Sequence, residues 1–519
     1  MTSGGVFVLK EVSGEAIWER TLPDLEATEH LARIIAQELC PGDLVTLAGD
    51  LGSGKTTLAR AILRSLTQNP KLDVPSPTFT IMQTYETLKG QVIHADFYRI
   101  GGPSDLIELD WDDLSEESIV LVEWPDRALS ELNPNRLEVL FDFDVLSGKR
   151  TAYLLGRGTF RQRVMTMVAV ENLLFKTPWG EAERIPIQGD ASTREYERLE
   201  LPNGPSAILM ISPRIPEGPP VRRGRSYRTI AKLADTVQAF VAIDQGLIAL
   251  GLSAPRIFLK DLDAGLLVLE DLGGEPVVDQ DGPIPERYQE AVRVLARMHR
   301  MTLPQKLPVT TTAEYELPVY DLEAMTIEVE LLLDWYIPSK RGRDISGSAR
   351  SEFGHLWTDI LKPVLAEPVT WTLRDYHSPN LFWLEDRNSI QKLGLIDFQD
   401  AVLGPFSYDL VSLLQDARVT VPADLELKLL AFYGRERHTF ENSFDIGAFA
   451  ETYAIMGAQR ATKILGIFTR LDKRDGKPQY LQHISRLETY LARNLEHPAL
   501  TRLKRWYVDN LPHLFENNS

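Results

Sequence analysis

The first 155 residues alternate short apolar runs with amphipathic stretches, a pattern typical of a sheet covered by helices on both faces. Buried strands are predicted at the most continuous apolar runs, residues 44–48, 92–95 and 119–123. An amphipathic helix is predicted at residues 57–66. The apolar runs 137–143 and 151–155 are separated by the turn residues Ser147-Gly148 and predict a hairpin.

The rest of the chain has a different pattern. Strands are predicted at residues 207–211 and 266–269, and after Arg287 the spacing becomes largely helical. Helices are predicted at residues 288–300, 322–335, 425–433, 449–467 and 480–495. A small sheet-rich lobe before a large helical lobe is the layout of a kinase-like fold.

The composition of residues 156–160, Gly-Arg-Gly-Thr-Phe, is that of a domain boundary. We therefore expect an α/β chain of two domains, residues 1–158 and 164–519. The second divides into a small lobe at about residues 164–272 and a large lobe at about residues 273–519. At 519 residues the chain is long enough for two or three separate cores.

Charge and cysteine content narrow the choice of partners. The net charge of -18 and pI near 5.1 disfavour direct binding to bare RNA or an anionic membrane. No apolar run approaches the ~18 residues that span a bilayer. Cys40 is the only cysteine, which excludes an intramolecular disulfide and fits a reducing cytoplasm.

A glycine-rich loop joins the first predicted buried strand to the predicted helix. Its residues are Gly49-Asp50-Leu51-Gly52-Ser53-Gly54-Lys55-Thr56, followed by Thr57. In a P-loop, glycines let backbone N–H groups face phosphate, a lysine reaches the β and γ oxygens, and a hydroxyl holds magnesium. The sequence therefore predicts an ATP and Mg²⁺ site made by Gly49, Gly52, Ser53, Gly54, Lys55, Thr56 and Thr57.

Three more motifs accompany this loop. They are Val74-Pro75-Ser76-Pro77-Thr78-Phe79, His94-Ala95-Asp96-Phe97-Tyr98-Arg99 and Leu121-Val122-Glu123-Trp124-Pro125-Asp126-Arg127. With them, about the first 155 residues resemble the bacterial TsaE family, the small ATPase of tRNA threonylcarbamoyladenosine biosynthesis. The resemblance implies a P-loop NTPase fold of three layers and an ATPase that acts with TsaD- and TsaB-type partners. It would then modify tRNA only indirectly.

Glu123 ends a predicted strand, where a carboxylate can hold the water shell of a metal or polarise an attacking water. We expect it to be catalytic and to bind the metal together with Thr56. Thr78 is expected on a loop that covers the phosphates, with a loop cap as the alternative. Asp96 and Tyr98 suit packing equally well, and His94 is expected to be structural.

A second phosphate-handling pattern lies in the other half of the chain. Asp375 and Asn380 have the catalytic-loop spacing of kinases, and Asp397 follows the apolar run 393–396. Phosphoryl transfer to a hydroxyl needs a carboxylate that accepts the proton and ligands for the metals that hold the phosphates. We expect Asp375 to be the base, Asn380 and Asp397 to bind metal, and His377 to be a packing residue.

With Tyr408-Asp409-Leu410, these motifs resemble the aminoglycoside/choline phosphotransferase family over about residues 164–519. The likeness is greatest to its amino-sugar kinases of the AmgK type, which phosphorylate N-acetylmuramate and N-acetylglucosamine at the anomeric hydroxyl. The resemblance implies a two-lobed protein-kinase-like fold. It also implies an ATP-binding loop, residues 189–194, that contributes Ser192 and Arg194, and a hinge that contributes Glu270 and Leu272.

The sequence departs from the kinase pattern in two places. The third strand, residues 207–212, has no lysine, so Arg194 or Arg214 would supply the charge opposite the phosphate. Leu373 stands where a histidine is expected. Both departures leave open a degenerate kinase that binds ligand and regulates the ATPase.

The acceptor is the other open point. A kinase for aminoglycosides, choline or another amine would need an acidic pocket, for which the candidates are Glu314, Glu316, Asp321, Glu323, Glu328 and Glu330. The same helical spacing suits an exposed face. The arginine-rich stretch 214–228 either faces an anionic group of the substrate or is solvated. We expect a sugar acceptor and no membrane partner.

Overall fold

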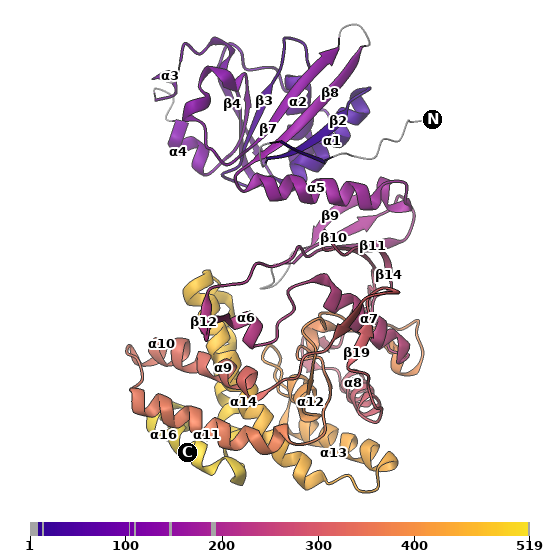
Figure 1. Cartoon of the computed structure of the whole chain (residues 1–519), viewed down its shortest axis with the longest axis vertical. Coiled ribbons are helices and arrows are strands. Elements are labelled where there is room, and N and C mark those ends of the chain that lie inside the picture. Colours follow the sequence, from indigo (N-terminus) through magenta and orange to yellow (C-terminus); the bar gives the residue numbers. More distant parts are fainter. Residues whose placement is uncertain are drawn as a thin grey trace. The chain divides into compact units, whose positions relative to one another are not determined.

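The computed structural model describes residues 9–12, 15–102, 104–107, 111–144, 148–187 and 194–516 (Figure 1). The chain folds into two compact units, Met1–Ala182 and Glu183–Ser519.

The first unit is built on one mixed sheet with the strand order β1-β2-β8-β7-β3-β6-β5-β4. Its strands are β1 (Leu9–Val12), β2 (Glu15–Thr21), β3 (Leu44–Ala48), β4 (Met82–Thr87), β5 (Gly90–Asp96), β6 (Ile119–Glu123), β7 (Arg136–Asp144) and β8 (Lys149–Arg157). Its helices are α1 (Leu25–Glu38), α2 (Lys55–Thr67), α3 (Ser104–Ile107), α4 (Trp111–Glu116) and α5 (Phe160–Leu174). Strands β7, β3, β6 and β5 are parallel, and the outer strands are antiparallel.

Apolar side chains on both faces of this sheet form two cores, which makes the unit three layers deep. One core joins the sheet to α1, α2 and α5, and the other joins it to α3, α4 and the short turns after β5 and β6. Strands β3 and β6 are buried along their whole length, as expected for central parallel strands. The predicted strands, helix and hairpin of this region are therefore confirmed.

Helix α5 packs against β2 and β8, with Phe160 and Val164 in the same core as α1 and α2. The compact unit consequently ends at Ala182, beyond the boundary that the glycine-rich residues 156–160 suggest. The difference arises because these residues are the end of β8, the two-residue turn Gly158-Thr159 and the start of α5, so they lie inside the unit. The turn residue Ser147 lies outside the described residues.

The second unit begins with the five-stranded antiparallel sheet β14-β15-β11-β10-β9. Its strands are β9 (Glu183–Ile187), β10 (Glu195–Glu200), β11 (Ser206–Ile211), β14 (Ile257–Asp261) and β15 (Leu266–Glu270). Helix α7 (Val237–Ala249) packs on this sheet through Phe240 and Val241, in one core with Met210 and Leu267. This arrangement confirms the predicted small lobe with its strands at 207–211 and 266–269.

The remaining elements of the second unit are mostly helices. They are α6 (Tyr227–Ile230), α8 (Pro285–Met298), α9 (Leu322–Leu331), a π-helical turn (Leu332–Tyr336), α10 (Ile337–Arg341), α11 (Gly347–Leu365), α12 (Ser407–Leu414), α13 (Ala423–Phe440), α14 (Ile446–Asp475), α15 (Ile484–Leu495), α16 (Thr501–Asn510) and α17 (His513–Glu516). Helix α14 contacts α9, α12 and α15 and lies at the centre of this lobe. The five helices predicted from spacing are confirmed.

Short strand pairs cross the helical lobe. They are β12 (Pro220–Arg222) with β13 (Arg225–Ser226), β17 (Val278–Asp279) with β18 (Gly282–Pro283), β19 (Lys306–Pro308) with β20 (Glu314–Glu316), β21 (Thr370–Thr372) with β24 (Val402–Gly404), and β22 (Leu381–Trp383) with both β16 (Glu275–Pro276) and β23 (Leu393–Leu395). Over the part of the chain that the structure describes, no helix is both long and apolar enough to cross a bilayer.

Gly466 allows the close approach of α14 and α9. A Cβ atom at Gly466 would lie 2.4 Å from the backbone carbon of Leu331 at the end of α9. We predict that Gly466→Ala destabilises the second unit by about 1–3 kcal/mol, because backbone cannot move aside as a side chain can. Urea denaturation followed by circular dichroism measures the change.

Gly354→Ala is the matched control, because Gly354 lies inside α11 and a Cβ atom there meets nothing within 4 Å. That substitution should leave stability unchanged or raise it by up to about 1 kcal/mol. Equal effects of the two variants would contradict the close helix contact as the reason for Gly466.

Candidate functional sites

The P-loop lies between the carboxyl end of β3 and the first turn of α2, in the middle of the parallel part of the sheet. Gly49 has φ of 139°, and a Cβ atom there would lie 2.8 Å from the carbonyl oxygen of Phe141. Glycine is therefore required at this turn. The loop backbone and the amino end of α2 together form the type of anion site that phosphate occupies in proteins.

Lys55 and Ser53 are two polar side chains of the loop. The Lys55 amine donates to the carbonyl oxygens of Gly49 and Asp50, both at 2.8 Å, and lies 3.8 Å from the ring centroid of Trp124. Burial lowers the Lys55 pKa from its ordinary value. The Ser53 hydroxyl is buried without a hydrogen-bond partner among the described residues, which leaves it free to donate to a ligand.

Glu123 lies beside the loop because β6 runs parallel to β3. One of its carboxylate oxygens accepts a hydrogen bond from the Thr56 hydroxyl at 2.9 Å. The other lies 3.0 Å from Nε2 of the fully buried His94 on β5. The Thr56 hydroxyl and the Glu123 carboxylate are therefore hydrogen-bonded to each other. His94 orients the carboxylate, consistent with its expected structural role.

Asp96, at the end of β5, organises the loop that contains Thr78. A single oxygen of its carboxylate accepts from the hydroxyls of Ser76 and Thr78, each at 2.7 Å. Its second oxygen accepts from the backbone N–H of Tyr98 at 2.9 Å. The Thr78 hydroxyl is thus bound by protein, which favours its reading as a loop cap.

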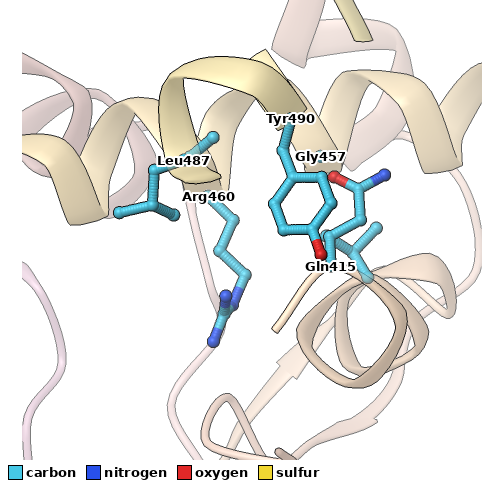
Figure 2. Close-up of a pocket in the computed structure, with 7 residues that line it drawn as sticks. Gln415, Gly457, Arg460, Leu487 and Tyr490 are labelled. Atoms are coloured by element: carbon cyan, nitrogen blue, oxygen red, sulfur yellow. The ribbon is translucent and has the colours of Figure 1, made fainter. Parts of the chain in front are cut away.

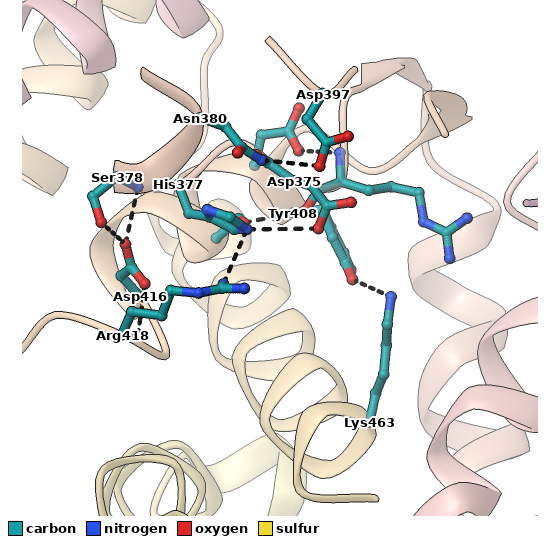
Figure 3. Close-up of polar contacts among 12 residues, drawn as sticks. Asp375, His377, Ser378, Asn380, Asp397, Tyr408, Asp416, Arg418 and Lys463 are labelled. Carbon is teal, nitrogen blue, oxygen red and sulfur yellow. Dashed lines mark hydrogen bonds and ion pairs between the residues drawn. The ribbon is translucent and has the colours of Figure 1, made fainter. Parts of the chain in front are cut away.

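The two aspartates of the second unit reach one place because β22 and β23 are antiparallel neighbours. Asp375 and Asn380 lie on the connection from β21 to β22, and Asp397 follows β23. The register pairs Leu381 with Leu395, and the backbone N–H of Ile396 donates to the Asn380 carbonyl. Residues 17 positions apart are thereby placed side by side (Figure 3).

Asn380 joins the two aspartates. Its amide nitrogen donates to the backbone carbonyl of Asp375 at 3.0 Å and to the Asp397 carboxylate at 3.4 Å. Asp397 also accepts from Gln399 at 2.8 Å and from Arg194 at 3.1 Å. Asp397 has a positive φ of 58°, an uncommon conformation that aims its carboxylate into this cluster.

The oxygen atoms of this cluster fit a magnesium ion. Magnesium takes carboxylate and amide oxygens, usually with phosphate oxygens of a substrate. The Gln399 side-chain oxygen is buried without a hydrogen-bond partner among the described residues, and Asp397 and Asn380 present further oxygens. Within the described ranges, no group of three or more His, Cys, Asp or Glu side chains is arranged to hold a metal.

Two buried aspartates bind the backbone of the connection between β21 and β22, residues 373–380, which we call the catalytic loop. Asp409 accepts from the backbone N–H groups of Leu373 and Arg374, at 2.6 and 2.9 Å. Asp416 accepts from the Ser378 backbone N–H and hydroxyl. Burial raises the pKa of Asp409 to about 7, although the two N–H groups oppose the rise.

His377 lies 3.7 Å from the Asp375 carboxylate, and its Nε2 is 3.4 Å from the Arg418 guanidinium (Figure 3). Burial lowers the pKa of His377 well below its ordinary value, so the ring is neutral at neutral pH. Desolvation opposes the ionisation of Asp375, but neighbouring His377, Lys463 and Arg374 hold its pKa below the ordinary value.

Beneath the loop, the Glu328 carboxylate of α9 is completely buried and surrounded by donors. Arg374 and Tyr320 donate to it, Gln459 donates at 3.2 Å, and the Lys463 amine lies 3.1 Å away. Lys463 also donates to the Tyr408 hydroxyl at 3.1 Å. Glu328 is therefore a structural anion that ties the catalytic loop to α9 and α14.

The small-lobe residues that were predicted to bind nucleotide lie in different surroundings. Ser192 lies outside the described residues. Arg194 is paired with Asp397, whereas Arg214 is largely exposed beside Asp235. β11 has no lysine, as expected, and Arg194 is the arginine of the two that lies at the cluster.

At the predicted hinge, the Glu270 side chain is bound by other residues, whereas, among the described residues, the Leu272 backbone N–H is not. The Glu270 side chain is bound by Arg256 and Arg387. The Leu272 backbone N–H has no hydrogen-bond partner in the described part of the chain. That N–H is the kind of group that an adenine ring binds.

The acidic residues weighed as an amine pocket are mostly neutralised. Arg222 pairs with Glu330, Arg225 with Glu323, Lys232 with Asp321 and Lys306 with Glu316, and Glu328 is buried, which leaves Glu314 exposed. Two of these cations come from the arginine-rich stretch 214–228, which therefore packs on α9 and is not simply solvated.

Sequence reasoning missed Lys463 and Asp416 as contributors to the catalytic loop. Neither lies in a motif, and each is brought to the loop by the packing of a distant helix or turn. Asp416 follows the apolar run 410–414, which is a common pattern and no specific signal.

Known protein families match the regions of the chain that contain the P-loop and the Asp375 cluster. The family model "Threonylcarbamoyl adenosine biosynthesis protein TsaE" matches residues 22–151, and the model "Phosphotransferase enzyme family" matches residues 183–442. N-acetylmuramate/N-acetylglucosamine kinase of Caulobacter vibrioides is 36% identical over 349 residues, covering 64% of this chain and 93% of the relative. tRNA threonylcarbamoyladenosine biosynthesis protein TsaE of Rickettsia prowazekii is 36% identical over 119 residues, covering 23% of this chain and 82% of the relative.

Among solved structures, an ethanolamine kinase of Plasmodium vivax is similar with 11% identity and a TM-score of 0.42. It covers 67% of this chain and 92% of that one. The two family models and the two relatives named above show that the chain belongs to the phosphotransferase enzyme family over residues 183–442 and carries a TsaE domain over residues 22–151, an ATPase fused to a kinase.

Proposed function

We propose that the second unit transfers the γ-phosphoryl group of ATP to the anomeric hydroxyl of an amino sugar, N-acetylmuramate or N-acetylglucosamine. The observation that carries the proposal is the meeting of Asp375, Asn380 and Asp397 on two adjacent loops. This set contains the base and the metal ligands that phosphoryl transfer to an alcohol needs.

In this reaction the acceptor oxygen attacks the γ-phosphorus, and a new O–P bond forms. The bond from the γ-phosphorus to the bridging oxygen breaks, and ADP leaves. Asp375 accepts the hydroxyl proton, a role that suits a carboxylate whose pKa is low enough to keep it ionised. Magnesium, held by Asn380, Asp397 and Gln399, would neutralise phosphate charge.

For the first unit we propose ATP binding by Gly49, Gly52, Ser53, Gly54, Lys55, Thr56 and Thr57, with Thr56 and Glu123 holding magnesium. Thr78 would act only by shaping the loop beside the phosphates. Glu123 would orient the water that attacks ATP, because it lies next to the P-loop and is held by His94. TsaD- and TsaB-like proteins would be its partners, with tRNA reached through them in the cytoplasm.

The charge pairing around the helical lobe supports a sugar in place of an amine. A cationic acceptor would need unpaired carboxylates, and four of the six candidates are paired with arginine or lysine while Glu328 is buried. The cluster around Asp375 contains the amide side chains of Asn380 and Gln399, which suit an acceptor with hydroxyl groups better than a cationic acceptor.

A panel of acceptors tests the proposal. The full-length protein is expected to consume ATP with N-acetylmuramate and N-acetylglucosamine and to give an acid-labile sugar 1-phosphate, identified by product mass. Kanamycin and choline are expected to give no product. If neither sugar stimulates ATP consumption but either one gives a thermal shift, the alternative of a regulatory binding module is favoured.

Lys55→Ala is predicted to weaken ATP binding at the first site about 10- to 100-fold, because a charged hydrogen-bond donor to phosphate is lost. Sugar phosphorylation should stay near the wild-type rate. ATPase assays without sugar and kinase assays with sugar, on the same preparation, separate the two. The exposed Lys71→Ala serves as control, and a joint loss of both activities would contradict two separate sites.

Asp375→Asn is predicted to lower kcat for sugar phosphorylation about 10²- to 10⁴-fold with ATP affinity nearly unchanged, because the amide cannot accept the proton. Asp397→Asn should weaken ATP binding in magnesium as well. Calorimetry with a non-hydrolysable ATP analogue in the Lys55→Ala background measures this difference.

Asp359→Asn, on the exposed side of α11, is the matched control and should change neither quantity. If Asp375→Asn weakens nucleotide binding as much as Asp397→Asn does, the roles of base and metal ligand are assigned incorrectly.

A further inference from the structure

Two features of the structure lie outside the groups to which a role has been given. One is a narrow pocket between α12, α14 and α15, whose lining includes Gln415, Gly457, Arg460 and Tyr490 (Figure 2). None of its lining residues belongs to the P-loop or to the Asp375 cluster, so the pocket adds nothing to either site. The other is Arg150 on β8, whose side chain lies against the P-loop of the first unit.

The sheet brings Arg150 to the P-loop. Strand β7 is a parallel neighbour of β3, which leads into the loop, and β8 pairs with β7 so that Arg150 stands opposite Phe143. Side chains alternate between the two faces along a strand, so Arg150 shares a face of β8 with Ala152 and Leu154. Those two residues pack in the same core as α2. Arg150 therefore lies on the face of the sheet that α2 covers.

Arg150 contacts the loop at Gly54, which precedes Lys55 and caps the amino end of α2. A Cβ atom at Gly54 would lie 3.5 Å from Cδ, Nε and Cζ of Arg150, so the end of the arginine side chain packs on the glycine. The Phe143 ring on β7 also lies near it, with its centroid 5.7 Å from the Arg150 Cζ. The guanidinium is thus held beside the loop backbone that faces phosphate in a P-loop.

The Arg150 guanidinium has no counter-charge at this position. Its Nε is buried without a hydrogen-bond partner, and the side chain forms no ion pair with any residue that the structure describes. A cation at the amino end of a helix is opposed by the helix dipole, and α2 has no acidic residue in its first turn. Lys55 adds a second positive charge at the same helix end. An anion bound at this end of α2 would stabilise both cations.

We propose that Arg150 donates hydrogen bonds to a phosphate oxygen of the nucleotide in the P-loop, so that the β7–β8 hairpin supplies a second cation to the site. The inference rests on the proposed ATP site of the first unit. An arginine suits this role because its planar guanidinium presents parallel donors that match a phosphate, whereas Lys55 acts as a point charge. The nucleotide would then be bound by the loop and by the hairpin together.

The test is calorimetry of the full-length protein with the non-hydrolysable ATP analogue and magnesium. The binding event that Lys55→Ala weakens is assigned to the first site. Arg150→Gln is expected to weaken that event about 10- to 100-fold, because a charged donor to phosphate is lost. Arg150→Lys should retain part of the affinity, since it keeps the charge but not the parallel donors.

Lys149→Gln is the matched control. Lys149 is exposed and is the neighbour of Arg150 on the opposite face of β8, so the substitution removes the same charge from the same hairpin. It should change the affinity by less than about twofold, because an exposed charge is screened by solvent.

Unchanged affinity in Arg150→Gln, while Lys55→Ala weakens binding, would overturn the contact and leave the ATP site standing. Equal losses in Arg150→Gln and Lys149→Gln would overturn it too, because the hairpin would then act only through its overall charge. If nucleotide-free Arg150→Gln unfolds at a lower temperature and Arg150→Lys regains no affinity, Arg150 is a packing residue and the proposal is wrong. If neither Lys55→Ala nor Arg150→Gln changes any binding event, the ATP site of the first unit fails together with this contact.

Discussion

The buried Glu328 carboxylate is the constraint on which the catalytic loop depends. A fully buried anion is stable only when donors surround it, and here the donors come from Arg374, Lys463, Gln459 and Tyr320. Arg374 precedes Asp375 directly and has φ of 69°, so the ion pair holds a strained backbone position. Removing Glu328 would deprive the buried Arg374 and the partly buried Lys463 of their carboxylate partner and release the loop that carries the proposed base.

The first unit uses carboxylates in the same way on a different scaffold. Asp96 collects the two hydroxyls of the Ser76–Thr78 loop, and Glu123 is fixed between Thr56 and His94. In both units acidic side chains organise neighbouring loops: Asp96 and Glu123 at strand ends in the first unit, and Glu328 on helix α9 in the second. The proposed chemistry differs because a P-loop presents backbone N–H groups to phosphate, whereas the kinase cluster presents oxygens to a metal.

The pairing of charges also bears on the acceptor. Of the six acidic side chains weighed as an amine pocket, four are paired with arginine or lysine and Glu328 is buried. The electrostatic character of a substrate site follows from which charges remain unpaired after folding. A count of acidic residues at and before α9 therefore does not measure how many carboxylates are available to a cation.

The sequence by itself determined the two folds, most helices and strands, and the residues of the P-loop and the catalytic loop. Those features depend on local periodicity and on short spacings, which a chain carries in its order of residues. Only the tertiary structure decided that α5 belongs to the first unit and that Glu328 is a structural anion. It also decided that Arg194, and not Arg214, lies at Asp397. Long-range packing decides such pairings, because contacts between residues 46 to 203 positions apart leave no periodic trace in the sequence.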